Sequence, residues 1–309
     1  MTSTQNEKGV AGIATLDIAK YQGTEVFEKN INEGVLAKIS GKLPELKIGS
    51  TDFFVFDTAG GVELVGENGQ KAGADHGIST VTAKTYKIQK TIRLSDELKN
   101  YDETQMAGIV DNIASVMFKD VSRALDLLAI HGINPATGEV SNLITDYLTK
   151  ADNGVQIIDA TANADTDVTA AAGKLLENGK MATAVAFDPK FVGELAKTTD
   201  KDGHQKYPEL GLGFQISSFQ GLPAVASDTV SARREMGTKA SVGAVMGDFA
   251  NSFKWGIAKD IELELIEHGD PDGKGDLKRF NQIAIRAEAY IGFAFGDPAS
   301  FVVVKKAAM

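Results

Sequence analysis

The chain has 309 residues, of which 43% are hydrophobic and 24% are charged, a composition typical of a globular protein. A chain of this length can bury a full core and is expected to form two compact units. Its formal net charge of −10 argues against broad binding of nucleic-acid phosphates, and the absence of cysteine excludes disulfides, thiolate metal sites and cysteine nucleophiles. The sequence shows no secretory signal and no run of the roughly 18 apolar residues that a membrane span needs, so we expect a soluble protein made and used in the cytoplasm.

The N-terminal part of the sequence predicts an arm, a short helix and a long β-hairpin. Residues 1–24 are polar with little periodicity, which is typical of an extended arm, and a short helix is expected around 25–39. Apolar residues are then spread strand-like through 53–92 among turn signals such as Asn68-Gly69, a pattern that favours a hairpin. The middle of this hairpin carries few large apolar residues, so it is marginal alone and needs a neighbour to hold it.

A single long helix follows the hairpin. Ser95 is placed to cap a short turn, and Asp102 with Gln105 three residues later makes a capping-box-like start. The 3.6-residue spacing of apolar residues predicts a helix from Asp102 to Ile130, which Gly132 closes. The apolar stripe consists of Met106, Ile109, Val110, Ile113, Met117, Val121, Ala124, Leu125 and Leu128.

Helices and strands alternate between about residues 140 and 250. This alternation indicates a separate α/β lobe, because each strand needs a helix to cover its apolar face. The expected elements are a helix over 168–180 preceded by Asp167, a strand over 182–187, a helix that begins at Pro189, a short strand after Gly221 and a strand over 242–247.

The C-terminal part predicts a long charged hairpin with one buried and one solvated face. A period of two is typical of such strands, and the run from His268 to Asp276 between them has the composition of a loop. The expected buried positions are Ile261, Leu263, Leu265, Ile283, Ile285, Ala287 and Ala289, and the expected solvated ones are Glu262, Glu264, Arg286, Glu288 and Tyr290.

The residues that could carry chemistry are scattered, and the sequence predicts no catalytic, cofactor-binding or metal-binding residue. The histidines His76, His131, His204 and His268 are far apart, so we expect structural or surface roles for them. No nucleophile elbow and no phosphate-binding loop motif is present in the sequence.

Three further patterns have simpler explanations than a site. Asp270, Asp272 and Asp276 resemble a calcium loop, but Lys274 falls where that loop needs an oxygen ligand, which favours a solvated hairpin tip. Gly211 and Gly213 imitate half of a dinucleotide fingerprint, but Ile216 replaces the third glycine. Glu262 and Glu264 share a strand face that could suit acid–base chemistry, but we expect it to be a wet face that is exposed to solvent or faces arginines or lysines of another subunit.

A series of short motifs keeps the order found in a known family over residues 50–304. The motifs are residues 62–71, 87–98, 124–138, 186–195, 202–203, 221–225, 247–249 and 297–302. Because its motifs follow this order, the chain resembles the major capsid proteins of tailed bacteriophages, the Hong Kong 97-type family. The motif series covers most of the chain, although each motif alone is short.

The resemblance implies an α+β chain with the Hong Kong 97-type capsid fold. That fold has an N-terminal arm, an extended β-hairpin loop, a peripheral lobe with a long spine helix and antiparallel strands, and an α/β axial lobe. The implied boundaries are 1–52 for the arm and short helix, 53–93 for the extended loop, 94–139 with 251–309 for the peripheral lobe, and 140–250 for the axial lobe. The arm and the loop bury too little within their own subunit, so adjoining copies are expected to cover them.

The function that the resemblance implies is structural. We expect a non-enzymatic head protein without cofactors that self-assembles through pentamers and hexamers into an icosahedral shell around double-stranded DNA. Its expected partners are other copies of itself, a separate scaffolding protein, portal and head-completion proteins, and DNA contacted non-specifically, with no membrane. A separate scaffold is expected because the sequence starts at Met1 without a long cleavable extension; a processed form is the alternative. The protein would be assembled in the bacterial host cytoplasm and reside in the virion capsid.

Two alternatives and one open point accompany this hypothesis. An encapsulin-like bacterial compartment protein would share the fold and load a protein cargo. A soluble two-lobed enzyme or ligand-binding protein, including a carbohydrate-binding one, would place its site between the lobes. Some family members join subunits by lysine-to-asparagine bonds; Lys71 and Lys84 lie in the corresponding loop, but no partner residue matches, so no crosslinking site is predicted.

Overall fold

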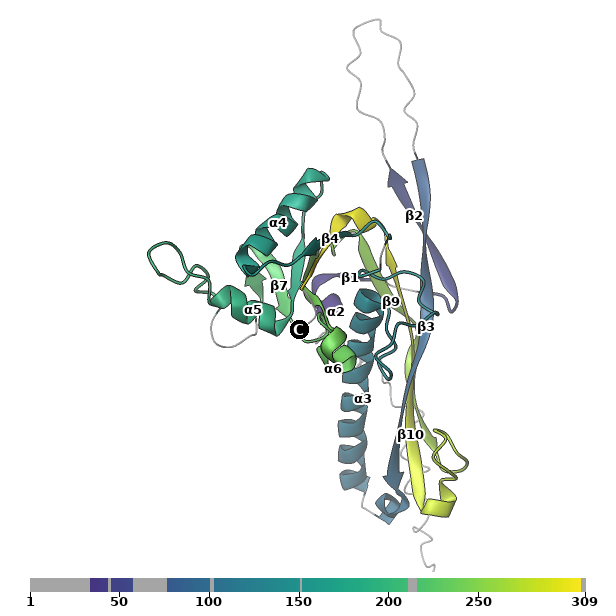
Figure 1. Cartoon of the computed structure of the whole chain (residues 1–309). Coiled ribbons are helices and arrows are strands. Elements are labelled where there is room, and N and C mark those ends of the chain that lie inside the picture. Colours follow the sequence, from purple (N-terminus) through teal and green to yellow (C-terminus); the bar gives the residue numbers. More distant parts are fainter. Residues whose placement is uncertain are drawn as a thin grey trace, which may run out of the picture.

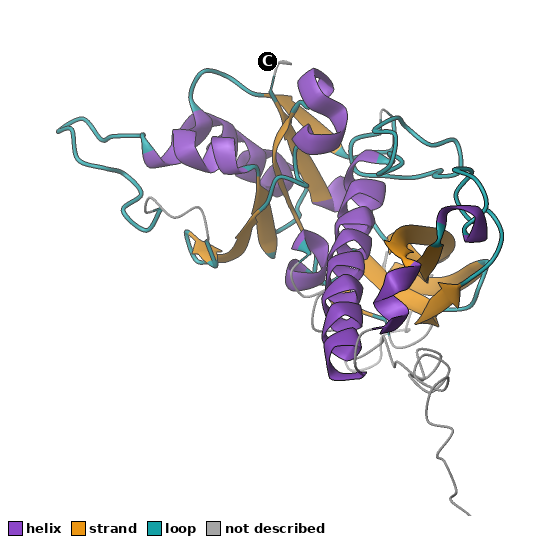
Figure 2. Ribbon diagram, turned by 90° about the horizontal axis from the view of Figure 1, so that it is seen from below, coloured by secondary structure: helices purple, strands orange, loops and turns teal. Residues whose placement is uncertain are grey.

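Two β-sheets flank one long helix in the computed structural model of the chain (Figures 1 and 2). The first sheet has the strand order β1-β9-β10-β3-β2 and the second has the order β4-β11-β8-β5-β7-β6. A shared hydrophobic core joins the helix to both sheets, so the two halves of the molecule pack against each other. The structure describes residues 34–43, 46–57, 77–100, 103–150, 152–210 and 216–306.

The long helix α3 spans Glu103–His131 and confirms the predicted helix, although Asp102, its expected cap, lies outside the described residues. Gly132 ends it with a φ of +65°, and its amide donates a hydrogen bond of 3.0 Å to the Leu128 carbonyl. A Cβ at this position would lie 2.3 Å from the Tyr147 ring, so only glycine fits. Side chains of the predicted stripe that are buried include Val110, Met117, Val121, Ala124, Leu125 and Leu128.

The first sheet contains the predicted C-terminal hairpin. Its strands β9 and β10 pair antiparallel with Leu265 opposite Ile285, and β10 pairs on its other side with β3. The predicted alternation along β10 is confirmed, because Ile285 and Ala287 are buried while Arg286 is only partly covered. The strand bounds are β1 Gly41–Lys42, β2 Ser50–Asp57, β3 Gly77–Ser95, β9 Phe253–Ile266 and β10 Gln282–Phe295.

The second sheet is covered on one face by α4 (Ala164–Glu177) and α5 (Pro189–Ala196), while its other face turns toward α3. Alternation along β5 shows this directly, since Val185 packs with the helices and Ala186 with the central core. The strand bounds are β4 Gln156–Asp159, β5 Ala184–Phe187, β6 Ser218–Phe219, β7 Leu222–Ala226, β8 Val242–Gly247 and β11 Phe301–Lys305.

The predicted start of α4 is wrong by several residues. The helix begins at Ala164, because the Asn163 side chain accepts a hydrogen bond of 3.1 Å from the Asp165 amide. Asp167, expected before the helix, instead lies buried within it, where its carboxylate accepts hydrogen bonds of 2.8 Å from the amide and the hydroxyl of Thr161. Both residues are good capping types, and the sequence pattern did not distinguish them.

The remaining elements are short. The helix α2 covers Val35–Ile39, inside the region predicted to be helical, while the expected arm lies outside the described residues. Ser95 caps the turn η2 (Asp96–Asn100) as predicted, since its hydroxyl accepts a 3.3 Å hydrogen bond from the Glu97 amide. The others are α6 (Arg233–Met236), η3 (Gly237–Lys239), η4 (Lys278–Phe280) and η5 (Pro298–Ser300).

The last strand lies in the second sheet. Within residues 251–309, β9 and β10 belong to the first sheet, whereas β11 pairs with β4 and β8 in the second. Its Val302 and Val304 side chains pack beneath α4, and this burial is available to the strand only in the second sheet. Among the described residues, no helix has the length and hydrophobicity required to cross a membrane.

Candidate functional site: a buried junction and a projecting ribbon

The described residues form no group of three or more His, Asp or Glu side chains that could hold a metal ion. His204 and His268 are exposed and His131 is buried, so the structure does not bring these histidines together. His76, like Gly211, Gly213 and Lys71, lies outside the described residues.

The aspartates of the hairpin tip bind an arginine. Arg93 of β3 donates from Nη2 to Asp270 at 3.0 Å, from Nε to Asp272 at 2.8 Å and from Nη2 to the Gly275 carbonyl at 2.8 Å. The tip is exposed, as predicted, but it is also folded back onto β3. The hydrogen bond from Arg93 lowers the pKa of Asp272, which keeps this carboxylate charged as the partner of a guanidinium.

The charged strand faces find partners within the chain. Lys87 forms an ion pair of 2.8 Å with Glu288, and Glu264 lies opposite Arg286 in the pairing of β9 with β10. Lys84, considered above for crosslinking, donates a 3.1 Å hydrogen bond to the Thr145 hydroxyl. The ion pair with Lys87 thus gives the Glu288 carboxylate a structural partner within its own chain.

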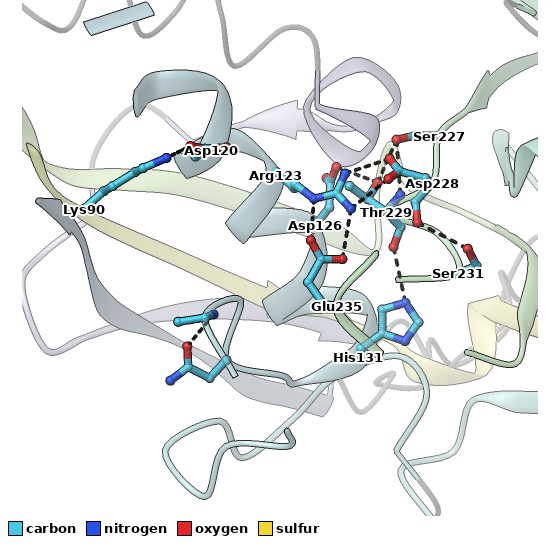
Figure 3. A network of polar contacts seen from close by, with 12 residues as sticks. Lys90, Asp120, Arg123, Asp126, His131, Ser227, Asp228, Thr229, Ser231 and Glu235 are labelled. Carbon is cyan, nitrogen blue, oxygen red and sulfur yellow. Dashed lines mark hydrogen bonds and ion pairs between the residues drawn. The ribbon is translucent and has the colours of Figure 1, made fainter. Parts of the chain in front are cut away.

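A buried polar junction ties α3 to the segment after β7 (Figure 3). Its centre is Arg123, whose guanidinium contacts Asp228 at 2.7 and 2.9 Å and Glu235 at 2.7 and 2.9 Å. Burial disfavours the charge on Arg123, but the hydrogen bonds to Glu235 and Asp228 outweigh this cost and raise its pKa. We use "the junction" for Arg123, Asp126, His131, Asp228, Thr229 and Glu235. A separate ion pair on the next turn of α3 joins Asp120 to Lys90 of β3.

Asp126 connects three parts of the chain. Its carboxylate, 1% exposed, accepts hydrogen bonds of 3.0 Å from the amides of Val35 and Leu36 at the start of α2. It also accepts a 3.1 Å hydrogen bond from the hydroxyl of Thr229. Burial raises its pKa to about 6, against the opposing effect of these donors and of Arg123.

His131 closes the other end of the junction. Its Nε2 lies 2.9 Å from the Val230 carbonyl and 3.3 Å from the Thr229 carbonyl, and its ring points toward Thr229 (Figure 3). Burial lowers its pKa to about 4, so the imidazole is neutral at pH 7 and Nε2 donates to a carbonyl. The junction therefore holds α2, α3 and the segment after β7 in one arrangement.

No functional role was predicted for Arg123 or Asp126 from the sequence. A usable signal was present, because Asp126 directly follows Leu125 of the apolar helix stripe and a charged residue there must be paired when buried. Its partners Val35 and Thr229 are 91 and 103 positions away and have no local pattern.

A ribbon of two strands projects beyond the first sheet (Figure 1). The pairing of β10 with β3 ends at Phe293 opposite Lys84, whereas β2 continues to pair with β3 as far as Asp57 opposite Gly77. We call residues 51–57 and 77–83 the ribbon root. Phe54 in this root is 66% exposed. The described part of the ribbon thus presents a large aromatic side chain that its own subunit leaves uncovered.

Comparisons with known proteins agree on one family. The model of the phage capsid family matches residues 18–306. A solved chain from Mycobacterium phage Ogopogo is 34% identical with a TM-score of 0.74, covering 88% of this chain and 92% of that one. A chain from Gordonia phage Cozz is 28% identical with a TM-score of 0.74, covering 100% of both chains. The capsid of an empty GTA particle computed with C5 symmetry, at 17% identity and a TM-score of 0.61, covers 89% of this chain and 90% of that one and supports the fold alone.

No curated protein matches the chain. The family match covers most of the chain, and it favours the capsid hypothesis over a cargo compartment and over a soluble enzyme or ligand-binding protein. The chain therefore belongs to the phage capsid family, and its function is the structural, non-enzymatic one of a major capsid protein that forms the head shell of a tailed phage.

Proposed function

We propose that copies of this chain assemble through pentamers and hexamers, and that the projecting part of the predicted 53–93 hairpin lies over a neighbouring subunit. The observation that carries the proposal is the ribbon root, whose described residues form strand pairs only with each other and expose Phe54, although Ala83 at its base packs within the subunit. Two-stranded hairpins are marginal alone in water, so a ribbon of this kind gains most from a surface on another copy.

The division into lobes supports the same arrangement. In this proposal α3 and the first sheet form the peripheral lobe. Residues 140–250, joined by β11, form the axial lobe that gathers around the five-fold and six-fold axes. Contacts in which one patch meets a different patch on the next copy close rings around such axes.

The further partners follow from the same proposal. We expect a separate scaffolding protein, a portal and head-completion proteins as further partners of the shell. The double-stranded DNA inside is contacted non-specifically, and the net charge of −10 supports weak rather than tight contact with phosphates.

The test is to shorten the ribbon and image the particles. Residues 54–80 are replaced by an Asn-Gly turn, which suits a two-residue loop between Phe53 and Val81, opposite each other in the pairing. We expect the subunit to unfold at nearly the unchanged temperature because its core is retained, while negative-stain images show no closed shells. Closed shells of the original size would overturn the proposal.

A further inference from the structure

A cavity that lies apart from the junction is lined by both apolar and charged side chains. Its volume is about 290 Å³, and it lies among the first turn of α5, the segment α6–η3, the start of β8 and the residue after β11. The described C-terminal end comes close to α5 and α6 here (Figure 1). We use "the basic cavity" for this space. Its charged and hydroxyl lining consists of Asp188, Lys190, Ser231, Arg233, Thr238, Ser241 and Lys306.

The basic cavity carries more positive than negative charge. Lys190, Arg233 and Lys306 line it against the single carboxylate of Asp188, although the whole chain has a net charge of −10. Lys306 is paired with Glu194 just outside the lining. Such a local reversal of sign is unusual on an acidic surface and attracts anions.

The one carboxylate in the cavity is already occupied. Asp188, with its side chain 3% exposed, accepts hydrogen bonds from the Ser231 hydroxyl at 2.7 Å, from Arg233 Nη2 at 3.0 Å and from the Lys190 amide at 3.1 Å. These contacts fix Arg233 at the cavity wall. The side chain of Lys190 is exposed and forms no ion pair within the described part of the chain.

The wall behind these groups is rigid. Phe191 is 2% exposed and packs so closely on β8 that a Cβ at Gly243 would lie 2.8 Å from its ring. Phe191 also stacks on Phe187 with ring centroids 5.9 Å apart. Rigid packing keeps the cavity open and holds the first turn of α5 beside it. The free amides of that turn point toward the N-terminal end of the helix.

We propose that the basic cavity binds an oxyanion, a carboxylate or a phosphate, held by Lys190 with Arg233 and the hydroxyls of Thr238 and Ser241. A lysine beside an arginine and hydroxyl donors is a common set for such groups, because each donor forms a charge-assisted or neutral hydrogen bond to an oxygen. The anion is either a small free ion or the carboxylate of a second copy of this chain.

The first arm of the test uses inorganic phosphate and the unassembled full-length chain. Phosphate is titrated at constant ionic strength, and binding is followed by the amide resonances of residues 190–191 and 238–243. We expect saturable binding, an affinity about tenfold lower in Lys190→Met, and recovery in Lys190→Arg, because removal of one charged donor accounts for a loss of that size.

Lys274→Met is the matched control, since it removes the same charge from an exposed loop at the tip of the β9–β10 hairpin. Its phosphate affinity should equal that of the unchanged chain. Lack of saturable binding would overturn the proposal, because the cavity would then hold no phosphate. Equal losses in Lys190→Met and Lys274→Met would also overturn it, because they would show only a general response to charge.

The second arm distinguishes the two sources of the anion and rests on the proposed assembly, whereas the first arm does not. Phosphate is titrated into assembled shells. Unchanged affinity identifies a free anion as the ligand. Lost binding in the shells, together with slower shell formation by Lys190→Met but not by Lys274→Met, identifies a carboxylate of a neighbouring copy.

Discussion

The junction and the ribbon root differ in where their stabilising contacts come from. In the junction, the Asp126 carboxylate and the His131 ring both find partners inside the subunit and are almost fully buried. In the ribbon root, the described parts of two strands pair only with each other and Phe54 stays exposed, while Ala83 at the base packs against the subunit's own core. The C-terminal hairpin tip is intermediate, because it lies at the surface but is held by Arg93.

This difference separates two kinds of stability. Contacts within the junction contribute to the folding of a single copy, since their loss leaves buried polar groups unpaired. Contacts that the ribbon makes with a neighbour contribute only after assembly, when a second copy covers its apolar surface. Substitutions in the two regions should therefore affect different measurements.

The largest expected effect is on the junction. Asp126→Ala leaves the amides of Val35 and Leu36 and the hydroxyl of Thr229 without their buried acceptor, so we expect a loss of about 3 kcal/mol in the free energy of unfolding at pH 7. Denaturant titration of the unassembled chain measures it. The control Asn112→Ala changes an exposed position of the same helix and should change little. Equal midpoints for the two variants would show that the junction does not stabilise the subunit.

The pH dependence of stability tests the two buried titratable groups of the junction. The pKa of Asp126 is raised to about 6, so protonation of its carboxyl stabilises the folded chain relative to the unfolded one. This pH-dependent contribution is fully present below the pKa of about 4 in the unfolded chain and is lost as pH rises through 6. The pKa of His131 is lowered to about 4, so its contribution is present above about 6.5 and is lost as pH falls through 4. The two contributions oppose each other between pH 7 and pH 4.

Single variants separate these contributions. Relative to the unchanged chain, Asp126→Asn should become less stable by on the order of 3 kcal/mol as pH falls from 7 to 4, because only the unchanged chain gains from protonating Asp126. His131→Gln should show a relative change of the opposite sign. Unfolding measured at several pH values gives both differences. Parallel curves for all three chains would contradict the assigned burial.

A smaller, local effect is expected at the hairpin tip. Arg93→Met removes the partner of Asp270 and Asp272, and the tip should open more often. Hydrogen exchange at the Gly275 amide, which donates 3.0 Å to Asp270, should become faster while the central amides of β10 keep their protection. The control Lys87→Met removes a cation from the same face of β3 and should leave Gly275 unchanged. Faster exchange throughout β10 would show that the tip and the sheet open together.

Local patterns predicted the elements better than their connections. The helix α3 and the strand β10 follow periods that burial imposes along the chain itself, and the strand β8 is a short apolar run that is buried throughout, so their positions were predictable. The position of β11 in the second sheet was not, because strand pairing depends on surfaces that meet only in the folded chain.

The junction was unpredictable for the same reason. Arg123 pairs with Asp228 and Glu235 across 105 and 112 positions, and no spacing rule links such distant residues. The shortage of apolar residues in the 53–92 hairpin was visible in the sequence, however, and that shortage led to the expectation of a neighbouring surface.

The smallest effect on the isolated subunit, and the sharpest contrast with the junction, is expected at Phe54. This side chain is 66% exposed, so Phe54→Ser should change the free energy of unfolding by less than about 0.5 kcal/mol. If a neighbouring copy covers the ribbon, the same substitution removes buried aromatic area from every copy of the contact, and far fewer closed shells should form. Phe54→Tyr keeps that area and should assemble normally. Normal shells from Phe54→Ser would show that no neighbour covers this residue, and a large loss of subunit stability would show that the ribbon root is held from within, as the junction is.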